Sequence, residues 1–453
     1  MADLSIDFAG IKAPNPFWLA SGPPTNSGYQ VMKAFDAGWG GAVWKTLGVP
    51  VVNVSSRYGA VNYRNHRMVG FNNIELISDR TLADNLREIE QVRKHFPHHP
   101  VIASLMVESR DEWHQIVRDV TNAGASGIEL NFGCPHGMCE RGMGSAVGQD
   151  PEVLQVIVGW VMEVARIPVV TKLTPNISHI TDPAIAAVEG GTNAISLINT
   201  VKSIVGVNLD TLTAYPEVDG LSTNGGYCGP AVKPIALNML KECAQHPDIH
   251  VPLSGIGGIE NWKDAAEFIL LGAGSLQVCT AVMHYGFGII RELLPGLERY
   301  MDGKGFRSIS EMCGRALPRQ VEWKKLNLKH KVVAEIDQGK CIGCQLCYIA
   351  CDDGAHQAIA LPTDGSRVPR IIEENCVGCN LCSLVCPVEQ CITMEKRDDG
   401  KESLTWEQRT AAGDIPDSFN DPRAGGNAHR VPTVEDAIRM RRRPSSQSNT
   451  IGS

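Results

Sequence analysis

The sequence lacks several features that would place the protein in common functional classes. It has no uninterrupted run of 18 apolar residues, so no segment predicts a transmembrane helix. The first residues, MADLSIDFAGIKAPNPFW, do not contain a basic segment followed by an apolar one. We therefore expect no secretory signal and a cytoplasmic protein. Basic residues are not in excess either: 42 Lys and Arg against 50 Asp and Glu give a net charge of −8, which argues against a nucleic-acid partner.

A dinucleotide fingerprint is also missing. No GxGxxG motif opens a helix after an apolar strand, so the sequence predicts no Rossmann-type site for nicotinamide or FAD. Disulfides are not expected, because eight of the 15 cysteines fall into two tight runs in a long chain. What is present is the composition of a globular protein, 43% hydrophobic and 20% charged, with 453 residues that allow two to four domains.

Short apolar runs of β-forming residues recur through the first 285 residues and alternate with amphipathic segments such as DPEVLQVIVGWVMEVA. The eight runs begin at Phe17, Gly41, Val101, Gly127, Pro168, Ala194, His250 and Ser275. This alternation predicts an α/β fold with parallel strands joined by helices, and eight units favour a closed (β/α)8 TIM barrel over residues 1–300. An open doubly wound sheet is the alternative.

Polar or reactive residues stand at the carboxyl ends of these runs, where the active site of a TIM barrel lies. They are Ser21, Lys45, Asn131, Cys134, Lys172, Asn199, Gly257 and Thr280. Because a lysine at the end of an apolar strand has to be solvated or paired, we expect these residues to form one site rather than to be eight unrelated structural residues. The glycines around Ile256 after the seventh run, with Cys279-Thr280 after the eighth, are typical of a phosphate-binding corner and favour FMN as the cofactor.

Two cysteine runs dominate the C-terminal part of the chain. The spacing C-x2-C-x2-C-x3-C occurs at residues 341–351 and again at 376–386, where Pro387 follows; Asp352 follows the first run. In bacterial two-cluster ferredoxins with this spacing, the fourth cysteine of each run ligates the other cluster. We therefore predict an α+β ferredoxin-like domain with two [4Fe-4S] clusters, and zinc sites are the alternative. The predicted ligand sets are Cys341, Cys344, Cys347 and Cys386 for one cluster, and Cys376, Cys379, Cys382 and Cys351 for the other.

These patterns divide the chain into the barrel, a connector at 301–333 that docks on it, the ferredoxin-like domain at 334–396, and a mobile tail at 397–453. The run of three arginines at 441–443 is interpreted as a solvated end. Four cysteines without ligand spacing are predicted to be free buried thiols: Cys228, Cys243, Cys313 and Cys391.

The segment NFGCPHGM, residues 131–138, continuing to GMGSAVGQDPE, resembles the active-site loop of dihydropyrimidine dehydrogenase. The resemblance extends over most of residues 10–395 and includes NIEL at 73–76, KLTPN at 172–176, NTV at 199–201 and the cysteine runs. In domain content the chain resembles the bacterial subunit that carries the pyrimidine site. The resemblance implies an enzyme of pyrimidine catabolism that reversibly reduces the 5,6 double bond of uracil and thymine on FMN. Electrons would reach FMN through the clusters from an NADH- or NADPH-oxidising flavoprotein partner in a hetero-oligomer.

The resemblance also implies roles for individual residues. Cys134 would exchange a proton with C5 of the pyrimidine while FMN exchanges a hydride with C6. Pyrimidine-binding positions would be Asn73, Glu75, Asn131, Phe132, Gly133, Asn199 and Thr200. FMN-binding positions would be Ala20, Ser21, Lys45, Thr46, Lys172, Gly229, Ile256, Gly257, Gly258, Cys279 and Thr280.

Three residues of the loop need separate mention. Gly133 stands where the family usually has serine, Cys139 adds a second thiol, and His136 is interpreted as a solvated loop residue rather than a proton relay. Two other functions are weighed against the main one. A dihydroorotate dehydrogenase-like enzyme would need a cation for the orotate carboxylate, which Glu75 would oppose, and a non-catalytic electron-transfer subunit would use the barrel only as a scaffold.

Overall fold

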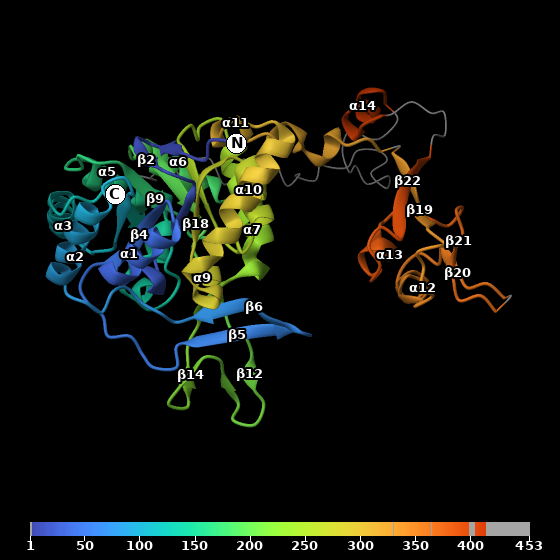
Figure 1. Cartoon of the computed structure of the whole chain (residues 1–453), viewed down its shortest axis with the longest axis horizontal. Helices are drawn as coiled ribbons and strands as arrows, with labels where there is room; N and C mark the ends of the chain where they lie inside the picture. Colours follow the sequence, from blue (N-terminus) through green and yellow to red (C-terminus); the bar gives the residue numbers. More distant parts are fainter. Residues whose placement is uncertain (1, 329, 364, 398–403, 414–453) are drawn as a thin grey trace, which may run out of the picture. The chain divides into compact units, whose positions relative to one another are not determined.

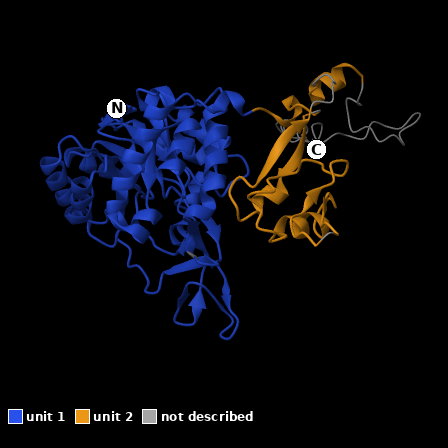
Figure 2. Cartoon of the chain, turned by 45° about the vertical axis from the view of Figure 1, so that its right-hand side comes forward, with its two compact units in different colours: residues 1–320 blue, residues 321–453 orange. Residues whose placement is uncertain are grey.

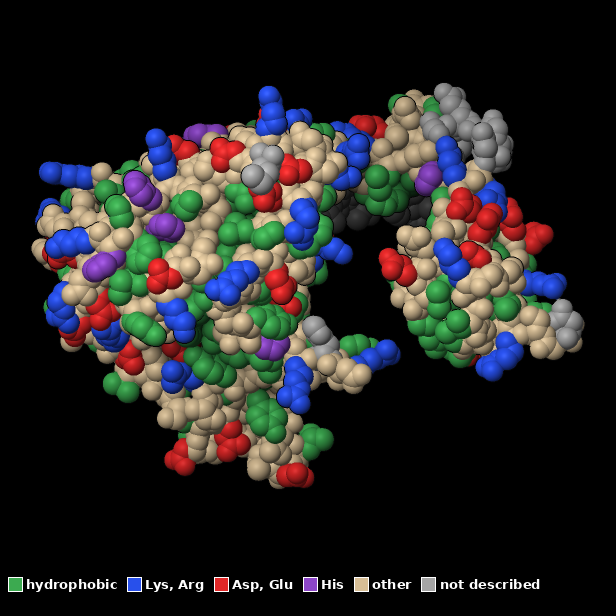
Figure 3. Space-filling model, in the orientation of Figure 1, with side chains coloured by type: hydrophobic (Ala, Val, Ile, Leu, Met, Phe, Trp, Pro, Cys, Tyr) green, Lys and Arg blue, Asp and Glu red, His purple; other side chains and the backbone are tan. Residues whose placement is uncertain are grey.

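The computed structural model describes residues 2–328, 330–363, 365–397 and 404–413. The chain divides into two compact units, residues 1–320 and 321–453, which Figure 2 colours blue and orange. Within the described residues, no helix combines the length and the apolar character needed to cross a membrane. Acidic and basic side chains are interspersed over the face of the first unit that Figure 3 shows.

The first unit is built on a closed parallel barrel, so the predicted (β/α)8 barrel is confirmed and the doubly wound alternative is excluded. The order around the barrel is β10-β17-β18-β3-β4-β7-β8-β9. All eight predicted runs supply a strand. Their bounds are β3 (Phe17–Leu19), β4 (Gly41–Leu47), β7 (Val101–Leu105), β8 (Gly127–Asn131), β9 (Val169–Lys172), β10 (Ala194–Leu197), β17 (Leu253–Ile256) and β18 (Ala273–Val278).

Amphipathic helices surround the barrel (Figure 1). They are α1 (Gly28–Ala37), α2 (Leu82–His95), α3 (Arg110–Asn122), α5 (Pro151–Met162), α6 (Thr181–Glu189), α7 (Lys233–Gln245), α8 (Trp262–Leu270) and α10 (Ile290–Lys304). Helix α3 illustrates why they form. The Ser109 hydroxyl accepts from the Glu112 backbone N-H, and the Glu112 carboxylate accepts from the Ser109 backbone N-H, which completes a capping box. Its buried residues Trp113, Ile116, Val117 and Val120 recur at helical spacing and face the strands.

A short hairpin precedes the barrel. Strands β1 (Ile6–Phe8) and β2 (Ile11–Ala13) pair antiparallel. Phe8 and Ile11 belong to a small apolar cluster with Trp18 and Val43, residues of two neighbouring barrel strands, and the rings of Phe8 and Trp18 meet edge to face at 5.6 Å. The hairpin therefore covers one end of the barrel interior.

An antiparallel sheet that the sequence patterns did not predict stands beside the barrel (Figure 1). Its order is β11 (Val201–Ser203), β16 (Gly225–Cys228), β6 (His66–Asn73) and β5 (Tyr58–Tyr63). Two small hairpins extend it, β12 (Val207–Asn208) with β13 (Thr213–Ala214) and β14 (Glu217–Val218) with β15 (Leu221–Ser222). The sheet joins insertions that follow barrel strands β4 and β10, and Asn73 pairs with Gly226 across it.

Shorter helices occupy the remaining connections. They are α4 (Ser145–Gly148), α9 (Thr280–Tyr285), α11 (Ile309–Met312) and the 3-10 turns η1 (Pro23–Thr25), η2 (Gly137–Arg141), η3 (Pro230–Val232), η4 (Phe287–Ile289), η5 (Leu317–Arg319) and η6 (Trp323–Lys325). Of the predicted connector, the part up to Gln320 lies on the barrel unit: the N-H groups of Gly314 and Ala316 donate to the carbonyls of Ile269 and Leu270 at 3.0 Å.

The second unit has the predicted α+β character. Strand β19 (Lys331–Ile336) pairs antiparallel with β22 (Ile392–Arg397), and β20 (Ile359–Ala360) pairs with β21 (Arg370–Ile371). Helices α12 (Leu346–Asp352) and α13 (Leu381–Leu384) follow the first cysteines of the two runs. Helix α12 continues through Asp352, whereas α13 ends before Pro387, whose ring restricts the residue before it to extended conformations.

Part of the tail predicted to be mobile is helical, since α14 spans Trp406–Ala411. The rings of Trp406 and Trp323 lie 5.7 Å apart, so this helix contacts the start of the second unit. Residues 398–403 and 414–453, which include the three arginines at 441–443, lie outside the described residues.

Candidate active site and cysteine cavities

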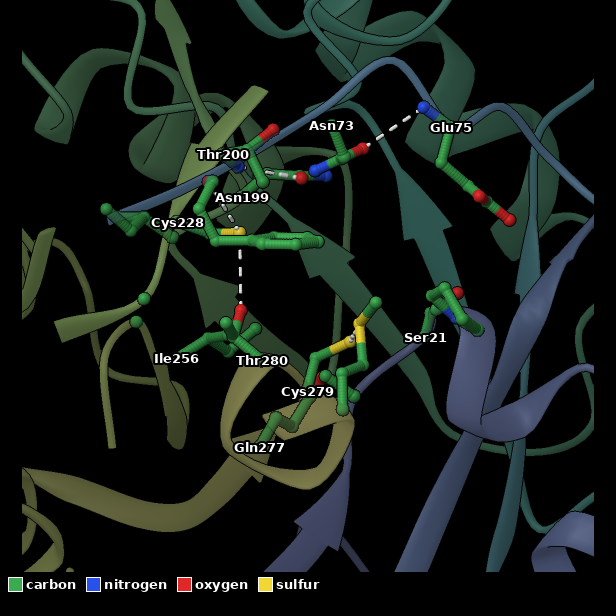
Figure 4. Close-up of a pocket in the computed structure, with 18 of the residues that line it drawn as sticks. Ser21, Asn73, Glu75, Asn199, Thr200, Cys228, Ile256, Gln277, Cys279 and Thr280 are labelled. Atoms are coloured by element: carbon green, nitrogen blue, oxygen red, sulfur yellow. Dashed lines mark hydrogen bonds between the residues drawn. The ribbon is translucent and has the colours of Figure 1, made fainter. Parts of the chain in front are cut away.

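A cavity opens at the carboxyl ends of the barrel strands. The antiparallel sheet completes its wall with Tyr58, Phe71, Asn73 and Cys228. Figure 4 shows how residues from distant segments surround it, with Asn73, Asn199 and Thr200 in one region and Cys279, Thr280 and Gln277 in another. All the barrel residues predicted to bind cofactor or substrate or to act in catalysis line this cavity, except Phe132 and Gly133.

These two exceptions have structural positions behind the cavity wall. Phe132 is 1% exposed and its ring packs 6.2 Å from that of Trp113 in the core. Gly133 donates its backbone N-H to Asn131 Oδ1 at 3.2 Å, and a Cβ added there would lie 2.3 Å from the Cβ of Asn199. The contribution of Gly133 to the site is therefore the absence of a side chain beside Asn199.

A partly buried ion-pair network lies at the end of β4. The Lys45 ammonium and the Arg57 guanidinium both donate to the Glu75 carboxylate, and the Tyr58 hydroxyl donates to it at 2.5 Å. Burial alone would raise the pKa of Glu75, but Lys45 and the hydrogen bonds outweigh it, so the pKa lies below its usual value. Burial, together with the bond to Glu75, raises the pKa of Tyr58 to about 12. Sequence reasoning missed Arg57 and Tyr58, because no motif contains them.

Lys172, at the end of β9, has a separate carboxylate partner. Its Nζ lies 3.3 Å from Oε1 of Glu129, a residue of β8 that is 0% exposed. Sequence reasoning also missed Glu129, although a lone acidic residue inside the apolar run GIELNFG was a signal that it needs a buried cation.

The asparagine side chains form a connected set. Asn199 Nδ2 donates to Asn131 Oδ1 at 3.0 Å, and Asn131 Nδ2 donates to Thr46 Oγ1 at 3.0 Å. The Thr200 N-H donates to Asn199 Oδ1 at 2.8 Å, which orients that amide. Each primary amide still has a second N-H, so the set can present donors to a ligand while its geometry is held by its own bonds.

Cys134 lies on the segment between β8 and η2 and is 9% exposed. Its surroundings are apolar, with Ile77, Met106, Met138 and Met143 in the same buried cluster, and its thiol contacts the His136 carbonyl at 3.5 Å. Burial raises the pKa of Cys134 to about 11. The thiol therefore keeps its proton at neutral pH.

His136 is buried, at 6% exposure, so the prediction of a solvated histidine is wrong. Its Nε2 lies 3.0 Å from the carbonyl oxygen of Glu75, and this contact ties the cysteine loop to the segment after β6. Burial lowers the pKa of His136, so the ring is neutral at pH 7. A neutral ring facing a carbonyl donates from Nε2, which leaves Nδ1 without a proton.

The other thiols of the barrel differ in exposure. Cys139 is partly exposed, accepts from the Ser145 hydroxyl at 3.3 Å and does not line the cavity. Cys243 is buried as predicted and Cys313 only partly. Cys228, which was also predicted to be buried, is only partly buried and lines the cavity. Its Sγ lies 3.2 Å from Thr280 Oγ1 (Figure 4), and desolvation raises the pKa of its thiol to about 11.

Three observations fit a flavin in the cavity. Gly257 and Gly258 have φ of +131° and +76°, and a Cβ on Gly258 would lie 2.8 Å from the Gly229 carbonyl, so only glycine allows this close backbone corner. Lys45 and Lys172 offer positive charge for a phosphate or an electron-rich ring. Gln277 Oε1 is buried in the cavity wall and has no hydrogen-bond partner among the described residues, which is the position of an acceptor for a ligand N-H.

The second unit contains two cysteine-lined cavities. One is lined by Cys376, Cys379 and Cys382 of the second run together with Cys351 of the first. The other is lined by Cys341, Cys344 and Cys347 together with Cys386, and also by Cys391, which is buried and lies outside the two runs. The thiols are therefore grouped in the crossed pattern that the spacing predicts. In the part of the chain that the structure describes, no three metal-binding side chains converge on a single-ion site, and thiols spread around a cavity fit a cubane better than zinc.

The barrel, its cavity with two lysines and a loop thiol, and the cysteine-lined second unit define a (β/α)8-barrel oxidoreductase with an attached iron-sulfur domain. A family model described as dihydroorotate dehydrogenase matches residues 3–301, and one described as a 4Fe-4S dicluster domain matches residues 334–394. The chain belongs to the dihydroorotate dehydrogenase family of flavin-dependent oxidoreductases.

Relatives with established names refine this placement. The chain is 43% identical over 359 residues to the NAD-dependent dihydropyrimidine dehydrogenase subunit PreA of Escherichia coli K12, covering 79% of this chain and 87% of that protein. It is 44% identical over 329 residues to the chloroplastic dihydropyrimidine dehydrogenase (NADP(+)) of Arabidopsis thaliana, covering 70% and 77%. It is 35% identical over 326 residues to the catalytic subunit of dihydroorotate dehydrogenase B (NAD(+)) of Thermococcus kodakarensis, covering 70% and 99%.

Proposed function

We propose that this chain is the pyrimidine-site subunit of a cytoplasmic dihydropyrimidine dehydrogenase, which reversibly reduces the 5,6 double bond of uracil and thymine. The observation that carries the proposal is the cavity itself, in which Cys134, three asparagines and two lysines meet at the barrel mouth. The relatives named dihydropyrimidine dehydrogenase share more of this sequence than the relative named dihydroorotate dehydrogenase B. All described cysteines are unpaired, as in a reducing compartment.

The asparagines suit a pyrimidine ring. Uracil alternates N-H donors with C=O acceptors, and primary amides can satisfy both. Asn131 and Asn199 hold each other in place, and Asn73 is fixed to the sheet through Nδ2, which donates to the Gly226 carbonyl at 3.0 Å. Thr200 joins this set through its own backbone bond to Asn199. A ring held by preset amides reaches the reacting thiol without further ordering of the site.

Cys134 holds the proton that is added to C5. With a pKa of about 11 the thiol is protonated at neutral pH, and its apolar surroundings keep water from competing for that proton. In the opposite direction the same sulfur receives the C5 proton. His136 fixes the loop that carries Cys134 through its contact with the Glu75 carbonyl.

The cofactors supply the electrons: bound FMN would provide the hydride, and two [4Fe-4S] clusters would relay single electrons to it. The residues that would hold FMN are the glycine corner at 256–258 with Gly229, the strand ends Ala20, Ser21, Thr46, Cys279 and Thr280, and the cations Lys45 and Lys172. The eight cysteines of the two runs, which line the two cavities, would hold the clusters.

A partner is required for the nicotinamide. The sequence has no dinucleotide fingerprint, yet the relative from Escherichia coli is named an NAD-dependent subunit. A flavoprotein that oxidises NADH or NADPH in a hetero-oligomer with this chain would supply the electrons. The isolated chain should then show little nicotinamide oxidation and gain it when that partner is added.

Oxidation of dihydroorotate is the second candidate, because the charge of Glu75 does not exclude it. Glu75 was expected to oppose the orotate carboxylate, but Lys45 and Arg57 neutralise its charge. The deciding experiment mixes the purified holoprotein anaerobically with dihydrouracil or with dihydroorotate and follows flavin absorbance. Bleaching by dihydrouracil supports the proposal, bleaching by dihydroorotate alone reassigns the substrate, and a protein without flavin would be an electron-transfer subunit.

A further inference from the structure

A carboxylate lies inside the barrel, beneath the cavity. Glu129 occupies the middle of β8, two residues before Asn131, so both side chains point to the barrel interior. It is 0% exposed, in a place that TIM barrels usually fill with branched aliphatic residues. A buried carboxylate persists only where its charge is paired and its oxygens are hydrogen-bonded, so its partners are informative.

Glu129 connects three other barrel strands. Its Oε2 accepts from Ser196 Oγ of β10 at 2.9 Å and from Gln277 Nε2 of β18 at 2.9 Å. Its Oε1 lies 3.3 Å from Lys172 Nζ of β9 and has no hydrogen bond of good geometry within the described residues. Glu129 and Lys172 thus interact through their opposite charges, and the ammonium N-H groups can donate to a ligand in the cavity.

The carboxylate also decides which way the Gln277 amide faces. Because a carboxylate only accepts, the amide nitrogen must point to Glu129, and Nε2 also lies 3.5 Å from Ser254 Oγ. Oε1 is the atom left for the cavity, and it has no partner among the described residues. Gln277 therefore presents an acceptor to an N-H such as that of the flavin pyrimidine ring.

The two cavity lysines differ in their compensation. Lys45 shares Glu75 with Arg57 and Tyr58, so the net positive charge of that network does not depend on Glu129. Lys172 has Glu129 as its single carboxylate partner among the ion pairs of the described residues. Removing the charge of Glu129 would leave one uncompensated positive charge in the cavity floor.

We infer that Glu129 is a positioning residue with two effects: it compensates the positive charge of Lys172, and it fixes which atom of the Gln277 amide faces the cavity. Through both effects it determines the reduction potential of the flavin. The inference rests on the proposed function in that it takes the cavity to hold FMN. Reduction of the flavin adds two electrons together with one or two protons. Uptake of one proton leaves an anionic ring, and uptake of two leaves a neutral ring. A nearby uncompensated cation favours the anionic product.

The test is the two-electron midpoint potential of the flavin, measured with reference dyes in purified holoprotein. Glu129→Gln keeps the size of the side chain and removes the charge, and we expect it to shift the oxidised-to-reduced equilibrium toward the reduced flavin by on the order of tenfold. For two electrons this is about 30 mV upward. Glu129→Asp keeps the charge and should shift the equilibrium less. Ser196→Ala is the matched control, since it removes a donor to the same oxygen without changing charge.

The double variant Glu129→Gln with Lys172→Met removes the uncompensated charge, so its potential should lie below that of Glu129→Gln. If the single variant does not fold, the double variant should still fold and bind flavin, and failure of both shows that Glu129 serves only to stabilise the barrel. An unshifted potential in Glu129→Gln, or an equal shift in Ser196→Ala, overturns this inference alone. A parent protein that binds no flavin overturns the proposed function as well.

Discussion

Gly133 and Asn199 are packed so closely that a single added carbon would not fit between them. A Cβ on Gly133 would lie 2.3 Å from the Cβ of Asn199 and 2.5 Å from its Nδ2. That Nδ2 is the atom that donates to Asn131, so the space beside Gly133 determines the position of the amide pair.

Gly133→Ala should therefore displace Asn199 and break its bond to Asn131. Loss of one such bond costs about 1 kcal/mol, and we expect KM for uracil to rise roughly fivefold to tenfold while bound FMN is unchanged. Steady-state kinetics and flavin content measure both. Gly159→Ala is the control, because a Cβ there meets nothing within 4 Å. An unchanged KM in Gly133→Ala would show that Asn199 does not position the substrate.

Replacing the two loop thiols tests the role of Cys134. General acid-base groups contribute typically 10² to 10⁴-fold, so Cys134→Ala should lose on the order of that factor in turnover and retain flavin and iron. Cys139→Ala should turn over uracil nearly like the parent, because Cys139 does not line the cavity. The reverse pattern, an inactive Cys139 variant beside an active Cys134 variant, would exchange their roles.

The raised pKa of Cys134 predicts an unusual pH dependence of alkylation. Only the thiolate reacts with iodoacetamide, so the alkylation rate of an ordinary thiol stops rising above its pKa of roughly 8.5. With a pKa of about 11, the rate at Cys134 should keep rising about tenfold per pH unit through pH 10. Mass spectrometry of the peptide that contains Cys134 gives the rate, and glutathione is the reference. A plateau near pH 9 would show that the thiol is not desolvated.

Double replacements distinguish crossed from sequential ligation of the clusters. The parent should contain about eight iron atoms and eight acid-labile sulfides. Cys344→Ala with Cys386→Ala removes two thiols of one cavity, so about four irons should remain. Cys344→Ala with Cys351→Ala removes one thiol from each cavity and should lose most of the iron. Iron and sulfide analysis would give the opposite result if each run held its own cluster.

The sequence by itself determined the barrel and the cysteine grouping. Each barrel strand is a local apolar run, seen most clearly in β4, where all seven residues are buried, and its polar ends necessarily meet at one edge of a parallel barrel. The cysteine spacing likewise requires one geometry of turn and helix. These features depend on residues that are near neighbours in the chain, so local patterns contain them.

Only the tertiary structure decided the remaining features of the site. Asn73 meets Gly226 across 153 positions and Gln277 meets Glu129 across 148, contacts that no local pattern encodes. The same holds for the burial of His136, because its loop packs on the segment after β6. The pairing of Glu75 with both Lys45 and Arg57 is of this kind too, since burial of the carboxylate and balance of its charge arise only when separate segments come together.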